Sequence, residues 1–84
     1  MILIGGKNTG KKLVNKIAKQ IEETGSAQVA AVTEKSALLI DRAIQKVANT
    51  LRTRLSANPE SGEVTINDEH RLALVVTITK ETQQ

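Results

Sequence analysis

The apolar positions of this 84-residue chain alternate between a spacing of two residues and a spacing of 3.6 residues. Met1 to Ile4 is a short apolar run ended by Gly5-Gly6, which is typical of a buried strand. Residues 9–24 carry apolar side chains at positions 13, 14, 17, 18 and 21, the stripe of an amphipathic helix. Gly25 is suited to end that helix, and a second short strand is expected over Gln28–Val32.

A longer helix is expected over Ser36–Leu55. Its apolar face consists of residues 37, 40, 44, 47, 48, 51 and 55. Leu38 and Leu39 fall outside this stripe, in the first turn. Two exposed leucines indicate a second apolar contact.

The last third of the chain predicts a loop and then a hairpin. Ser56–Gly62 is a loop by composition because it contains Asn58-Pro59 and Ser61-Gly62. Glu63–Asn67 and Arg71–Lys80 alternate as strands on either side of a polar turn, with residues 72, 74, 76 and 78 on one face of the second strand. The element order is therefore βαβαββ. It predicts a single α+β domain over residues 1–84, a two-layer sandwich with two helices on one face of a four-stranded mixed sheet.

Charge is distributed unevenly around a net value of +3. Residues 1–21 carry five lysines and no acid, residues 22–55 carry five bases and four acids, and residues 56–84 carry two bases and five acids. Such segregation directs one end of a molecule toward a polyanion. A solvated lysine face is the plainer alternative.

The basic end contains a glycine-rich turn, Gly5-Gly6-Lys7-Asn8-Thr9-Gly10-Lys11-Lys12, between the first strand and the first helix. It fits G-x-x-x-x-G-K, but Lys12 stands where a nucleotide-binding loop needs Ser or Thr for Mg²⁺. We therefore expect attraction of phosphate at a helix N-terminus, without nucleotide hydrolysis. The alternatives are a turn shaped by glycine alone and a site for a small phosphorylated ligand.

Other residues give no case for an enzyme or a cofactor. The chain has no aromatic residue, which rules out an aromatic platform for base stacking. It has no cysteine, so disulfides and thiolate metal sites are excluded and a reducing cytoplasm is the expected location. His70 has no partner at a telling spacing, the acids lack metal-ligand spacing, and no apolar run is long enough for a membrane span.

Several stretches resemble Alba proteins, small nucleic-acid-binding proteins with the same βαβαββ order. Ile2-Leu3-Ile4-Gly5 followed by lysine is similar to their opening strand and turn, and Leu39–Val47 resembles their second helix. Arg52-Thr53-Arg54 is similar to the arginine pair that ends that helix. Gly25–Val32 also resembles stage V sporulation protein S, a bacterial relative of the same fold.

The resemblance implies a dimer that holds nucleic-acid phosphates by basic residues of the first turn and of the connection to the second helix. The residues at or near those places, with two further candidates from the helices, are Lys7, Lys11, Lys12, Lys35, Lys16 and Arg42. Leu38 and Leu39 are the candidate dimer-interface residues. The hairpin is expected to be short, with an acidic turn (Asp68 and Glu69), where DNA-binding members have a longer basic arm.

Two functions follow from these observations. The first is a dimeric protein that binds DNA or RNA through the phosphate backbone, without reading bases. The alternative is a regulatory module, similar to the sporulation protein, that acts through protein partners and uses its lysines only as a solvated face.

Overall fold

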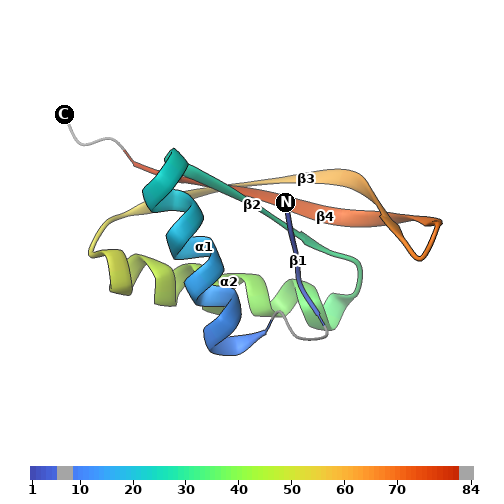
Figure 1. The fold of residues 1–84 in the computed structure, drawn as a ribbon, viewed down its shortest axis with the longest axis horizontal. Helices are drawn as coiled ribbons and strands as arrows, with labels where there is room; N and C mark the ends of the chain where they lie inside the picture. Colours follow the sequence, from blue (N-terminus) through green and yellow to red (C-terminus); the bar gives the residue numbers. More distant parts are fainter. Residues whose placement is uncertain (6–8, 82–84) are drawn as a thin grey trace.

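Two helices cover one face of a four-stranded mixed sheet (Figure 1), as the alternation of apolar positions predicts. The computed structural model describes residues 1–5 and 9–81. Its elements in chain order are β1 (Ile2–Leu3), α1 (Gly10–Thr24), β2 (Ser26–Ala31), α2 (Glu34–Leu51), β3 (Leu55–Ile66) and β4 (Glu69–Lys80). The predicted fold class is confirmed. No helix in this part of the chain is long and apolar enough to cross a membrane.

The sheet has the strand order β1-β2-β4-β3. β1 pairs with β2 in parallel, and β4 lies antiparallel between β2 and β3. Because α1 connects the two parallel strands and α2 connects β2 to the edge strand β3, both helices pack on the same side. The other side of the sheet is left without a helix (Figure 1).

Aliphatic side chains alone form the core. The largest that are fully buried are Leu13, Ile17, Ile21, Val29, Val47 and Ile78, between the helices and the sheet. A smaller cluster of Ala30, Ala73 and Val75 lies on the helix-free face, since successive residues of a strand point to opposite faces. No polar side chain is buried among the residues described.

The two helices end in the same backbone conformation with different residues. Gly25 caps α1 at φ 86°, in the left-handed region that glycine tolerates. Arg52 caps α2 at φ 52° and ψ 46°, where a side chain raises the energy of the backbone by about 1–2 kcal/mol. α2 therefore stops at Leu51, four residues before the predicted end, and Leu55 belongs to β3. Its N-terminus is capped by Thr33, whose Oγ1 accepts a hydrogen bond from the Ser36 N–H at 3.0 Å.

The predicted loop over Ser56–Gly62 is wrong, because these residues form the first part of the 12-residue strand β3. Pro59 does not prevent this, since β3 is an edge strand, where a missing N–H can face away from the sheet. Close packing against Val75 explains why residue 62 of this strand is a glycine. A Cβ at this position would lie 2.6 Å from Cγ2 of Val75.

The hairpin of β3 and β4 is long, which corrects the expectation of a short one. Its turn is short, because Asn67 and Asp68 both have positive φ (49° and 63°), as in the two-residue turns that suit twisted strands. Glu69 belongs to β4 rather than to the turn. Each strand is 12 residues long, and the end of the hairpin projects beyond α2 (Figure 1). We call residues 60–74, which comprise the turn and the adjoining parts of both strands, the arm.

Candidate functional site

Two adjoining hollows lie between α1 and α2. One, of about 160 Å³, is lined by Gly10, Leu13, Val14, Leu39, Arg42, Ala43 and Lys46. The other, of about 460 Å³, is lined by Lys11, Val14, Asn15, Lys46, Asn49 and Thr50. Val14 and Lys46 line both, so the hollows form one continuous depression, which we call the interhelical groove. Its charged lining residues are all cations.

The spacing of residues on α2 explains this lining. Arg42, Lys46 and Asn49 recur at intervals of four and three residues, so they share the side of α2 that faces α1. Lys35 lies seven residues before Arg42 and shares that side. Glu34 instead lines a hollow on the opposite side, toward the arm. α2 thus presents its basic side chains to α1.

The charges of α1 oppose its own dipole. Lys11 and Lys12 occupy its first turn, which contains no acid, and Glu22 and Glu23 lie near its C-terminal end. A helix favours anions at its N-terminus, and each misplaced exposed charge costs about 0.3–1 kcal/mol. The lysines therefore do not serve the stability of α1. An anion bound at this end would be attracted both by them and by the free backbone N–H groups.

The cations of the groove are not neutralised within the described residues. In the described part of the chain, Arg71 forms an ion pair with Glu69 at 3.4 Å, and His70 Nδ1 lies 3.2 Å from Glu63 Oε1; both contacts lie on the arm. No carboxylate of the described part of the chain forms an ion pair with Lys11, Arg42 or Lys46. The groove is therefore available to an external anion.

The structure brings some of the predicted site residues together and leaves others apart. Lys11 and Arg42 line the groove. Lys12 and Lys16 are exposed on α1 outside its lining, and Lys35 is exposed in the first turn of α2. The prediction for Lys7 falls outside the described residues.

Sequence reasoning missed four groove residues: Asn15, Lys46, Asn49 and Thr50. A signal for Lys46 was present, because it lies one helical turn after Arg42. The neutral residues carried no such signal, since only the crossing of the two helices places Asn15 opposite Asn49. Thr50 donates from Oγ1 to the Lys46 carbonyl oxygen at 2.8 Å, which leaves its lone pairs as acceptors.

A separate apolar surface lies beside the arm. Leu72 is 83 % exposed and Leu74 38 % exposed, although both continue the buried face of β4, because they line an open hollow between this strand and the start of α2. Leu38 of α2 is 73 % exposed, one turn after Glu34, which lines the hollow between α2 and the arm. We call Leu72 and Leu74 the arm-side surface. The expectation of two exposed leucines holds for Leu38 only, since Leu39 packs against the core.

The side chains that line the groove can bind an anion. Guanidinium and ammonium groups attract phosphate, and the amides of Asn15 and Asn49 can both donate and accept hydrogen bonds. Among the described residues, the lining contains no histidine, carboxylate or cysteine. No protein-family model matches the chain, and no curated protein sequence matches it, so its function is inferred from this geometry.

Proposed function

We propose that the protein binds DNA or RNA by holding backbone phosphates along the interhelical groove. The observation that carries this proposal is the convergence of Lys11, Arg42 and Lys46 from two helices, with no carboxylate of the described residues paired to them. Phosphate is the anion of choice for such a site, because arginine can donate two parallel hydrogen bonds to it and lysine adds a point charge. These contacts position a nucleic acid and carry no sequence information.

A nucleic acid suits the groove better than a free nucleotide. Lys12 replaces the hydroxyl that would ligate Mg²⁺, and the chain has no aromatic side chain on which a single base could stack. The resemblance to Alba proteins points in the same direction. It implies phosphate contacts at the first turn and before the second helix, and Lys11 and Lys35 lie close to those two places.

The arm-side surface supports a homodimer as the binding unit. Exposed leucines that continue a buried strand face are typical of a protein interface. The same surface is the specific observation behind a second candidate function, a regulatory module whose partner is another protein. Nucleic-acid binding depends on the groove, whereas binding of a protein partner depends on the arm-side surface. Variants of the groove and of the arm can therefore separate the two candidate functions.

Fluorescence anisotropy with labelled duplex DNA and with single-stranded RNA, at several salt concentrations, tests the proposal. Neutralising three phosphates predicts a slope of log affinity against log salt of about −2.7 on duplex DNA, at about −0.9 for each contact. Arg42→Gln combined with Lys46→Gln should flatten the slope by about 1.8. Arg71→Gln is the matched control, because it removes a cation from the arm, outside the groove.

Two results would count against nucleic-acid binding at this site. One is an absence of salt-dependent binding by the unmodified chain. The other is an unchanged slope in the Arg42 and Lys46 double variant. If binding to a protein partner is lost with Leu72→Glu and is insensitive to the double variant, the regulatory module is the better description.

A further inference from the structure

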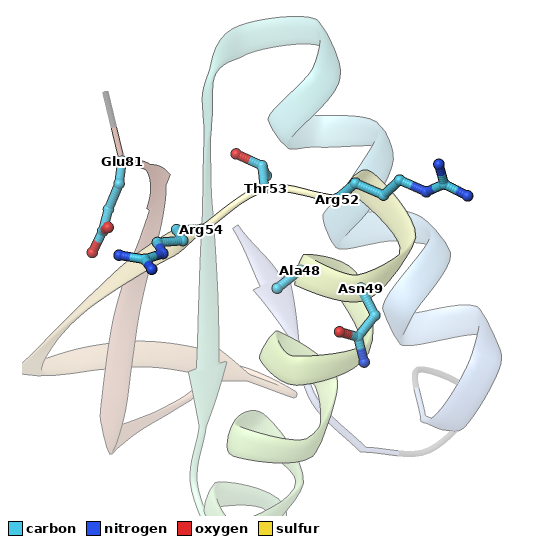
Figure 2. Close-up of a pocket in the computed structure, with 6 residues that line it drawn as sticks. All are labelled: Ala48, Asn49, Arg52, Thr53, Arg54 and Glu81. Carbon is cyan, nitrogen blue, oxygen red and sulfur yellow. The ribbon is translucent and has the colours of Figure 1, made fainter. Parts of the chain in front are cut away.

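A further hollow, of about 570 Å³, adjoins the far end of the interhelical groove. It is lined by Ala48, Asn49, Arg52, Thr53, Arg54 and Glu81 (Figure 2). Asn49 lines this hollow and the groove alike, so the two surfaces are continuous along α2. Figure 2 shows the side chains of Arg52 and Arg54 extending to opposite sides of Thr53.

The backbone conformation of Arg52 is unfavourable for a residue with a side chain. Its φ of 52° is the left-handed conformation in which α1 of the same chain uses Gly25. A cation that served only the negative end of the helix dipole could sit in the last turn of α2 without backbone strain, yet that turn contains no basic residue. Strain at a single well-defined position is a reason to look for a function of the side chain.

We infer that this end of α2 binds two further phosphate groups of the same nucleic-acid strand, one at Arg52 and one at Arg54 on the opposite side of Thr53. The inference rests on the proposed function, and it adds two arginines to the binding residues. Asn49 and Thr53 supply neutral hydrogen-bonding groups beside them. The bound polymer then runs along α2 from Arg42 to the end of the helix.

The length of this path decides which ligand can use it. Ten residues separate Arg42 from Arg52, which corresponds to about 15 Å at 1.5 Å per helical residue. Phosphates of one strand in duplex DNA advance about 3.4 Å along the axis, so about five nucleotides are needed to reach both ends. Inorganic phosphate or a dinucleotide can contact only one end at a time.

Glu81 forms the acidic wall of the hollow. Its Oε1 accepts a hydrogen bond from Ser56 Oγ at 3.2 Å, and its backbone N–H donates to the Arg54 carbonyl oxygen at 3.0 Å. These contacts hold the carboxylate beside the path, where it repels a phosphate. Glu81→Gln should therefore strengthen binding of a long oligonucleotide while keeping the side chain's size.

The test compares long and short ligands in anisotropy titrations. For a single-stranded oligonucleotide of about 15 residues, Arg52→Gly combined with Arg54→Gln should flatten the salt slope by about 1.4, at about 0.7 per contact. That slope corresponds to about a tenfold loss of affinity near 0.15 M salt. Affinity for a dinucleotide should fall much less, because a dinucleotide can still bind in the groove. Arg42→Gln with Lys46→Gln should weaken both ligands.

Glycine and asparagine both tolerate the left-handed conformation, so Arg52→Gly and Arg52→Asn remove the charge without straining the helix end. Retained binding in Arg52→Lys would support a role for the charge. If the Arg52 and Arg54 double variant binds the long oligonucleotide as the unmodified chain does, the two phosphate positions at the end of α2 are wrong, and the groove proposal stands. If the unmodified chain shows no salt-dependent binding, the proposed function itself fails.

Discussion

Lys11 and Lys12 are neighbours in the first turn of α1, yet they have different surroundings. Lys11 lines the interhelical groove opposite Lys46, whereas Lys12 lies about 100° further around the helix and outside the lining. Lys11→Glu and Lys12→Glu, made separately, are therefore a matched pair. Both change the charge at the same helix end, and only one changes the groove.

Both substitutions should stabilise the protein. Each removes a misplaced cation and adds an anion at the positive end of the dipole, and each half of the exchange is worth about 0.3–1 kcal/mol at an exposed site. The expected gain is about 1 kcal/mol per variant. In a domain of this size that gain raises the melting temperature by about 4–8 °C. It should shrink at high salt, because these charges are exposed and screened.

Nucleic-acid binding should separate the two variants. Lys11→Glu removes one phosphate contact and places a carboxylate in the groove, so the salt slope on duplex DNA should flatten by about 0.9 and the affinity should fall at least tenfold. Lys12→Glu should keep the slope, since it removes no contact. Paired thermal melts and anisotropy titrations measure both effects on the same samples.

Two outcomes would refute this reasoning. If both variants are destabilised, the lysines do not oppose the dipole of α1, and the argument that they are retained for binding is lost. If both variants lose the same amount of affinity, the groove is not the binding surface, and a diffuse lysine face explains the attraction better.

Three further predictions concern the scaffold. Gly62→Ala should lower the free energy of unfolding by about 1–3 kcal/mol, because the added Cβ would overlap Val75 Cγ2. An unchanged midpoint of urea unfolding would contradict the close contact between Gly62 and Val75. Arg52→Gly should raise the free energy of unfolding by about 0.5–1 kcal/mol, because the relief of left-handed strain exceeds the entropy that glycine adds to the unfolded chain. Thermal melting measures this change, and a lower melting temperature would argue against strain. Leu72→Glu should convert a dimer to a monomer in sedimentation without loss of helix content, and a dimer that persists would place the interface elsewhere.

The sequence was sufficient to predict the helices and strands that depend on local periodicity. The stripe of α1 and the alternation of β4 identified both elements, because burial of one face imposes a period on consecutive residues. The element order then restricted the fold to two helices on a mixed sheet. The basic character of the first helix was equally visible, since charge is a property of composition.

Local composition misled where a partner strand overrides it. Ser56–Gly62 contains proline, glycine and asparagine, yet β4 pairs with it along its whole length and makes it a strand. The long arm follows from that pairing. The exposure of Leu72 follows as well, because this part of β4 faces an open hollow beside the start of α2 and not the packed core. No pattern within the strand could show where the helices beneath it end.

Some features of the candidate site could likewise be predicted from the sequence, and others could not. Sequence alone determined that α1 begins with lysines and that Arg42 lies on a polar face, and it predicts phosphate as the ligand that this chemistry attracts. Only the tertiary structure decided that Lys11 meets Lys46 across a groove and that Arg52 lies at its far end in a strained conformation. Periodicity fixes the direction of a side chain relative to its own helix. The neighbour it faces depends on how two helices cross, and packing against a common sheet sets that crossing.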